Sequence, residues 1–293
     1  MAPAVVLAGW MAAAAALAVQ TAAPEMVARY ALWPLLVGIV VVGLPHGALD
    51  HLVPARLGFA WGRRPLPLAG FLAAYVGAVA SYGAIWWVAP GSAFIGFLAL
   101  TIWHWGQGDQ RFLELFLGRR RLGRVGTLAT ILTRGSLPVL VPVLAFPAAA
   151  DDLLSRASGA LGLEAPAWTI ADPTLRLVLM ALLVGLLAAY VRSAVRAARD
   201  ARSALLDLGE VALLLGFFAT VPAYAAIGVY FLAWHSLRHL ARLLLLRPSE
   251  AERVRRGNVA GPVGRLTLDL LPITLAAVAV LIGAAAWAGE NLG

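Results

Sequence analysis

The sequence predicts an all-α fold, a polytopic bundle of about nine transmembrane helices that forms one integral membrane domain over residues 1–293. Composition is the first indication. Of the 293 residues, 61% are hydrophobic and 13% are charged, and the mean hydropathy is +0.84, values far from those of soluble globular proteins. The second is that the hydrophobic residues gather in runs of about 20, the length of a membrane-spanning helix.

Nine apolar runs are long enough to span a bilayer. In chain order they cover residues 3–22, 31–54, 66–89, 92–117, 126–149, 174–195, 204–221, 223–246 and 266–288. The first run resembles a secretory signal in length, but no positive charge precedes it, so we expect a membrane anchor helix. Residues 1–30 are then an extra N-terminal element in front of a bundle at 31–288.

Arginines mark alternate loops between these runs. They follow the second, fourth and eighth runs and surround the turn between the sixth and the seventh, whereas the other loops are nearly uncharged or, at 148–172, acidic. By the positive-inside rule the arginine-rich loops and the N-terminus are cytoplasmic, and the C-terminus lies outside the cell (inner) membrane. This pattern accounts for the net charge of +8, so we expect no nucleic-acid partner.

Four of the five histidines fall within three of the runs that are predicted to cross the membrane in the same direction. His46 lies in the second run, His104 in the fourth, and His235 and His239 in the eighth, where a spacing of four residues puts both imidazoles on one helix face. At 1.5 Å per residue, the four lie about 18 to 24 Å from the outer ends of their helices. His51 points to another side of its helix, and we expect a structural or interfacial role for it.

Histidines at one depth in a membrane predict a shared metal site, because buried ionisable residues there require partners. The chain has no cysteine, and imidazole binds Zn, Cu, Fe and Ni, so several metals remain possible. Four neutral ligands with open coordination positions fit a non-haem Fe(II) oxygenase, whereas a haem would need only two of them. Asp50 and Asp109 are predicted to hold the histidine N–H groups, or else to form ion pairs with Arg238 or Arg111.

The remaining polar residues of the runs also require partners. Asp207, Glu210 and Asp269 are expected to pair with Arg242, Arg265 or each other near the cytoplasmic boundary. Glycines adjoin the histidines, and we expect them to let helices approach closely around the metal. These glycines are Gly43, Gly47, Gly106 and Gly108.

At these histidines the sequence resembles a known family. The segments GLPHGALD at 43–50, HWGQGD at 104–109 and WHSLRH at 234–239 are similar to the Brp/Blh family of membrane-embedded β-carotene 15,15'-dioxygenases. The resemblance covers about residues 31–288 and implies an enzyme that cleaves lipid-dissolved β-carotene with O2 into two retinals, with Fe(II) as cofactor. By motif position the implied iron ligands are His46, His104, His235 and His239.

The implied substrate is a long apolar polyene, so flat side chains near the histidines are candidates for its binding site. We expect this role for Trp103, Trp105, Phe231 and Trp234. Members of the family usually carry a further apolar segment with a Pro-His pair near the C-terminus, and the segment GENLG at 289–293 stands where it would begin.

Three alternatives remain at this stage. A membrane di-iron desaturase or hydroxylase needs more histidines than the five present. A transporter or haem-binding membrane protein would use pairs of histidines. A non-catalytic accessory protein of the same family would bind a carotenoid or retinal without cleaving it. The sequence does not indicate the oligomeric state.

Overall fold

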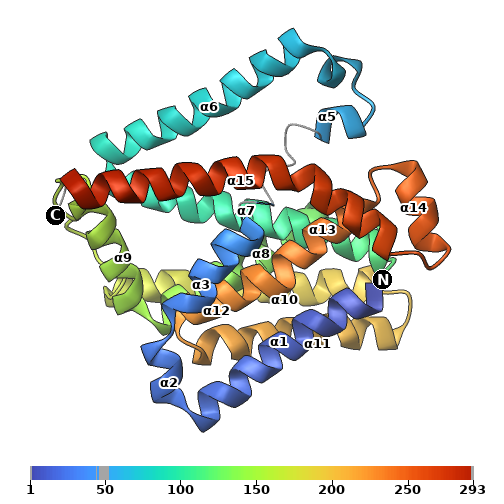
Figure 1. Cartoon of the computed structure of the whole chain (residues 1–293). Coiled ribbons are helices and arrows are strands. Elements are labelled where there is room, and N and C mark those ends of the chain that lie inside the picture. Colours follow the sequence, from blue (N-terminus) through green and yellow to red (C-terminus); the bar gives the residue numbers. More distant parts are fainter. Residues whose placement is uncertain (1, 44, 46–52, 292–293) are drawn as a thin grey trace.

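The computed structural model is a helical bundle, and it describes residues 2–43, 45 and 53–291. No strand occurs in this part of the chain, which confirms the predicted all-α class. The long helices are α1 (Ala2–Ala22), α6 (Pro65–Val88), α7 (Pro90–Phe116), α8 (Arg124–Ala145), α10 (Pro173–Ala197), α11 (Ala201–Thr220) and α15 (Ala260–Asn291) (Figure 1). The shorter ones are α2 (Pro24–Arg29), α3 (Leu32–Gly38), α5 (Val53–Arg56), α9 (Pro147–Gly159), α12 (Ala223–Tyr230), α13 (Ser236–Leu244) and α14 (Pro248–Arg255).

Some of the nine expected spans correspond to long apolar helices of the structure, and others do not. Within the described residues, six helices are long and apolar enough to cross a membrane, so a count of nine is not confirmed. The fourth expected span is present as α7, but its second half is polar. The second is described only as α3 and a π-helical turn, η1 (Ile39–Gly43), because residues 46–52 lie outside the described part.

The eighth expected span is continuous but not uniform. Helix α12 passes into a π-helical turn, η4 (Phe231–His235), and then into α13. The wide turn closes where Ser236 N–H donates to the carbonyl of Phe231, five residues earlier. Such turns are rare and are frequently found at functional sites. Here the turn contains His235, and His239 follows four residues later in α13.

Proline and glycine residues set where the helices begin and end. Proline occupies the first helical positions of α6, α7, α9 and α10. At these positions a backbone N–H would have no partner within the helix, so proline loses no hydrogen bond there. Helix α7 ends at Phe116, and two residues later Gly118 has a φ of 62°, the left-handed conformation that glycine adopts without a steric cost. Arg119 N–H then donates back to the Leu113 carbonyl over 3.1 Å, which turns Arg119 towards the bundle.

Helix α8 is the centre of the bundle and packs against α7, α10 and α11. Its crossing with α7 is unusually close because both helices lack side chains there. A Cβ on Gly106 would overlap the carbonyl of Ile131, and a Cβ on Gly135 would overlap the carbonyl of Ile102. The expectation that Gly106 lets helices approach closely is therefore confirmed, although the approach is to α8, a helix without histidine.

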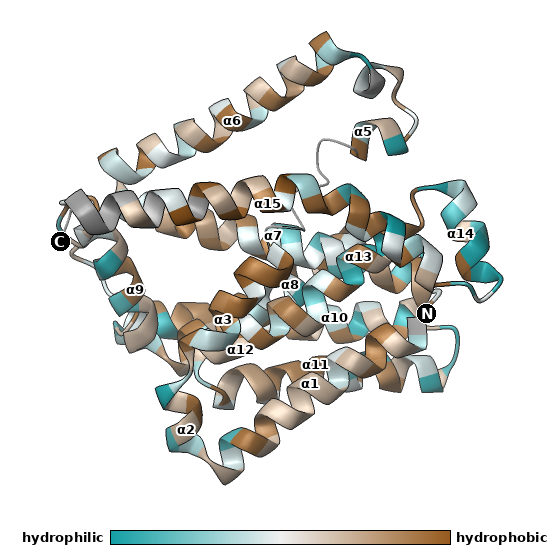
Figure 2. Cartoon of the chain, in the orientation of Figure 1, coloured by the Kyte–Doolittle hydropathy of each residue, from teal (hydrophilic) through white to brown (hydrophobic). Residues whose placement is uncertain are grey.

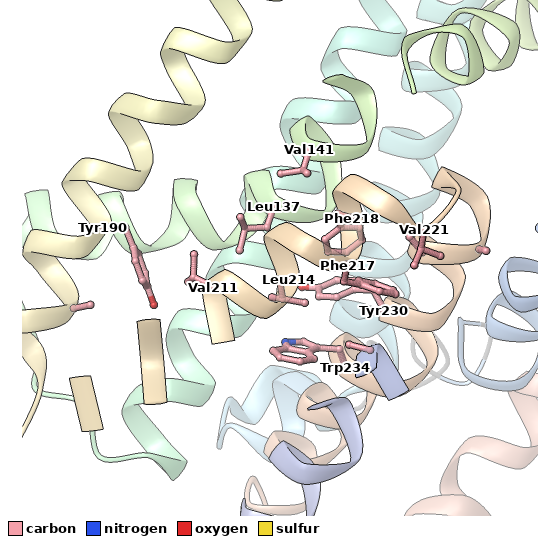
Figure 3. Packing of buried hydrophobic residues seen from close by; sticks show 14 residues of the cluster. Leu137, Val141, Tyr190, Val211, Leu214, Phe217, Phe218, Val221, Tyr230 and Trp234 are labelled. Atoms are coloured by element: carbon pink, nitrogen blue, oxygen red, sulfur yellow. The ribbon is translucent and has the colours of Figure 1, made fainter. Parts of the chain in front are cut away.

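The main apolar core lies among α1, α8, α10, α11 and α12. Figure 3 shows Phe217, Phe218 and Tyr230 gathered above Trp234, with Tyr190 farther along the cluster. Helix α1 belongs to this core, since its Ala13 is buried and its Gly9 packs on the Trp234 ring. The N-terminal helix is thus integrated into the bundle beside the histidine helix.

The outer surfaces carry the remaining apolar residues. Figure 2 shows hydrophobic colours along α3, α6 and α15 and hydrophilic ones on α14. No residue of α6 is buried, and large side chains such as Leu66, Val76 and Val88 are exposed along it. An exposed apolar helix of 24 residues is suited to contact with lipid.

Candidate functional site

Three of the four predicted metal ligands lie in the described part of the structure, and two of them are adjacent. The imidazole rings of His104 on α7 and His235 in η4 have centroids 5.3 Å apart, inclined at 58°. His235 is buried, with 4% of its surface exposed, whereas His104 lies at an exposed position of α7. We call these two residues the histidine pair. The fourth predicted ligand, His46, lies outside the described residues, as do His51 and Asp50.

His239 is held by an arginine one turn further along α13. Arg242 Nη2 lies 3.0 Å from His239 Nδ1. A guanidinium is only a donor, so Nδ1 accepts and Nε2 carries the proton of a neutral ring. An imidazole that binds a metal through Nε2 carries its proton on Nδ1 instead. Ligation by His239 therefore requires Arg242 to move from its present position.

The side chains of the described residues thus supply only part of a metal site. The histidine pair supplies two imidazoles in adjacent positions. Within residues 2–43, 45 and 53–291, no group of three or more His, Asp or Glu side chains has an arrangement that could hold a metal ion. The four-histidine site therefore stays a prediction.

A cluster of buried charges packs next to the histidine pair. Arg238 lies on α13 between His235 and His239, and it donates to Asp109 over 2.7 Å and to Glu210 over 2.6 Å. Its guanidinium also lies over the Trp234 and Phe112 rings. Asp109 therefore forms the ion pair with Arg238 that the sequence left open, and a role as a histidine partner stays a prediction.

Arg134 is the second centre of this cluster. Its guanidinium, on α8, is fully buried and contacts Asp109, Glu210 and Asp207. Its Nε donates to the Tyr190 hydroxyl over 2.8 Å, and that hydroxyl in turn donates to Asp207 over 2.6 Å. We call the following six residues the ionic cluster: Arg119, Arg134, Arg238, Asp109, Asp207 and Glu210.

The ionic cluster balances its own charge, since three guanidinium groups face three carboxylates. Balance matters because an uncompensated buried charge is strongly destabilising. Trp10 on α1 adds a hydrogen bond of 2.9 Å to Glu210. The cluster therefore joins α1, α7, α8, α11 and α13 beside the histidines.

The expected partners of three acids were wrong. Asp207 and Glu210 pair with arginines of other helices, namely Arg134, Arg119 and Arg238. Asp269 pairs with Arg56 and Arg247, while Arg265 binds Glu250. The sequence placed these acids near arginines in the chain or at a shared depth, and the actual partners come from helices that only the fold brings together.

An apolar cavity of about 280 Å³ lies next to the histidine pair, although neither histidine of the pair lines it. Trp105 and Phe231 line it, and their rings lie 5.7 Å and 6.0 Å from the His235 ring. On α7 the other lining residues are Phe94, Phe97, Leu98 and Thr101. Leu35 of α3, Pro138 and Pro142 of α8, and residues of α9 and α12 contribute to the other walls.

The four aromatic residues predicted to bind substrate lie in different surroundings. Trp105 and Phe231 line the cavity. Trp234 is buried in the core beneath Arg238, and Trp103 is exposed on α7. Apart from Trp105, the α7 residues that line the cavity were not predicted from the sequence. Their signal was the spacing of positions 94, 97, 98, 101 and 105, which places them on a single helix face.

The sequence was compared with known families and proteins. Residues 37–292 match the family model described as beta-carotene 15,15'-dioxygenase. The chain is 36% identical over 287 residues to the probable beta-carotene 15,15'-dioxygenase Blh of Halobacterium salinarum, an overlap of 97% of this chain and 82% of that protein. The probable dioxygenase Brp of the same species is 30% identical over 217 residues, 71% of this chain and 57% of Brp. No solved structure matches the chain.

Proposed function

Because this chain belongs to the β-carotene 15,15'-dioxygenase family, we propose that it cleaves β-carotene at its central double bond with O2 to give two molecules of retinal. The observation that carries the proposal is that two aromatic residues lining an apolar cavity, Trp105 and Phe231, pack against the His235 ring of the histidine pair in a chain of this family. In the overall reaction the central carbon–carbon double bond breaks, and each new aldehyde receives one atom of O2.

The cofactor in this proposal is Fe(II), with His46, His104, His235 and His239 as its ligands. Bound Fe(II) would supply the one-electron chemistry that lets O2 react with an alkene. His104 and His235 are already adjacent, and ligation by His239 would require Arg242 to leave Nδ1.

The chain's own residues bind and orient the substrate. Trp105 and Phe231 offer flat faces between the cavity and His235, which suits the planar polyene. The apolar lining keeps water from the double bond. Arg238 and Asp109 hold α13 against α7, so the two imidazoles keep their relative position as substrate enters.

The location follows from the substrate. β-Carotene dissolves in the hydrocarbon core, and the described part of the chain has six helices suited to that environment. We propose the cell (inner) membrane, with the N-terminus cytoplasmic and the C-terminus outside, from the arginine distribution. Substrate would then enter laterally from the lipid.

The test is expression in a bacterium that makes β-carotene, with pigments separated by chromatography and iron measured in purified protein. Wild type should convert β-carotene to retinal and contain about one iron per chain. His104→Ala and His235→Ala should each lower retinal formation by at least about a hundredfold and lower the iron content. His51→Ala is the matched control and should retain both.

Two results would contradict the proposal. One is retinal formation by His235→Ala at the wild-type rate, which would remove the ligand assignment. The other is wild-type protein that holds β-carotene without converting it. That outcome would favour a carotenoid-binding accessory protein, a second candidate that the apolar cavity also supports.

A further inference from the structure

We infer that the apolar cavity holds one arm of the carotenoid up to its terminal ring, and that its length determines which double bond lies at the histidine pair. This inference rests on the proposed function and adds the origin of its regiospecificity. The cavity begins at Trp105 and Phe231, beside His235. It continues to the other end of α7, where Phe94, Phe146 and Ala149 line it.

The lining indicates a ligand without polar groups. No charged side chain lines the cavity among the residues that the structure describes. Thr101, Trp105 and Tyr224 are the lining residues that carry a polar side-chain atom, and the rest of the lining is apolar. The hydroxyl of Thr101 donates to the Phe97 carbonyl of its own helix over 2.8 Å, so it offers the ligand no free donor. A retinoid acid, a phosphate or a sugar would lose its hydrogen bonds to water on entry, whereas a hydrocarbon arm would lose none.

The length of the cavity matches half of a carotenoid. Phe94 and Trp105 both line it, and at 1.5 Å per residue they lie about 16 Å apart along α7. One arm of β-carotene is a zigzag of nine carbon–carbon bonds of about 1.4 Å each, which advances roughly 11 Å and ends in a ring about 4 Å across, so the arm needs about 15 Å. An arm inserted to the far end therefore places the central double bond beside Trp105, whose ring lies 5.7 Å from that of His235.

Small side chains line the far end of the cavity. Helix α9 follows α8 directly and contributes Ala149 and Ala150 to the lining, while Ala223 at the start of α12 faces the same end. Alanines leave room for the bulky terminal ring next to Phe94 and Phe146. Larger side chains at these positions would shorten the cavity without touching the histidines.

The experiment shortens the cavity from its far end. Ala149→Phe and Ala223→Phe are tested separately, with Ala148→Phe as the matched control, because Ala148 is exposed on α9 and does not line the cavity. Purified, iron-loaded protein is given either β-carotene or an apocarotenal that lacks one terminal ring. Products are identified by chromatography, and folding is checked by size exclusion.

The lining variants should lose at least about tenfold in kcat/KM on β-carotene, as expected when a pocket becomes too small for its ligand. Their remaining products should include aldehydes of unequal length. The apocarotenal, whose truncated arm fits the shortened cavity, should be cleaved within about threefold of wild type. Ala148→Phe should behave as wild type on both substrates.

The inference is overturned if both folded lining variants convert β-carotene to retinal alone at the wild-type rate. It is also overturned if their kcat/KM falls equally on β-carotene and on the apocarotenal. Failure of the proposed function is a different result, namely wild type that makes no retinal. In that case β-carotene binding is measured by absorption. Binding that Ala149→Phe abolishes still supports the arm site, and binding that it leaves unchanged overturns it.

Discussion

The ionic cluster and the apolar cavity are built on the same helices, on either side of the histidine pair. Helix α7 lines the cavity from Phe94 to Trp105 and then contributes Asp109 to the cluster. Helix α8 runs the other way, with Arg134 in the cluster and Pro142 in the cavity. From the cavity towards the cluster, the residues of each helix thus change from apolar to charged. The histidine pair lies near this boundary.

The two regions hold the bundle together in different ways. In the ionic cluster, each charged group has partners from other helices, so the positions of α7, α8, α11 and α13 depend on one another. In the cavity, apolar side chains surround open space, and no single pair of side chains is needed to hold the helices in place. We therefore expect substitutions in the cluster to affect folding and substitutions in the cavity to affect the ligand.

The largest effect should follow from removing Arg134. Arg134→Met leaves Asp109, Asp207 and Glu210 without their shared cation, and breaking a buried ion pair costs about 3 to 5 kcal/mol. Thermal unfolding of detergent-purified protein should show a large loss of stability, and the yield of folded protein should fall. Arg124→Met, an exposed arginine of the same helix, is the control. Equal stability of the two variants would show that the cluster does not hold the bundle.

A smaller effect should follow at the contact between α7 and α8. Gly106→Ala places a methyl group against the Ile131 carbonyl, and overpacking of this kind costs about 1 to 3 kcal/mol. Because the helices separate beside His104, retinal formation should fall as well. Gly185→Ala, on α10 with open space around it, should be neutral or slightly stabilising. The same thermal and chromatographic assays distinguish the two, and a neutral Gly106→Ala would contradict the close crossing.

The smallest effect is expected inside the cavity. Thr101→Val replaces a hydroxyl that bonds only within its own helix by a methyl group facing an apolar space. Such intrahelical bonds contribute little to stability, so we expect a change below about 1 kcal/mol and retinal formation within about twofold of wild type. A substantial loss of activity would mean that the hydroxyl contacts a polar ligand, and the apolar assignment of the cavity would be wrong.

Much of this architecture could be predicted from sequence, because hydropathy and helix length are local properties. The apolar runs predicted the long helices, and the spacing of His235 and His239 placed both on one helix. The approach of His104 to His235 agrees with the depth predicted from residue counts. The count of nine spans is not confirmed, because the second, fourth and eighth expected spans, where charged or helix-distorting residues interrupt the apolar run, are not among the six apolar helices of the described residues.

The partners of buried charges could not be predicted in the same way. Asp207 and Glu210 were assigned to arginines at a similar depth, yet Arg134 from the fifth predicted span binds both. Nothing in a single helix indicates which neighbour it will face, since that depends on how α8 packs against α7 and α11. The cavity was not predicted for the same reason, because α7 supplies one wall and residues of α3, α8, α9 and α12 supply the others.

The π-helical turn at Phe231–His235 gives the helix that carries the histidines one place that can absorb a change of one residue in chain length. Deleting one residue between Phe231 and His235 would make the hydrogen bond from Ser236 to Phe231 an ordinary α-helical one, so α13 would keep its orientation. Deleting Leu237, inside α13, would instead rotate Arg238 and His239 by about 100° around the helix axis, and Arg238 would turn away from Asp109 and Glu210. Insertions and deletions, usually tolerated only in loops, therefore have one position within this helix where a residue can be lost while Arg238 and His239 keep their neighbours.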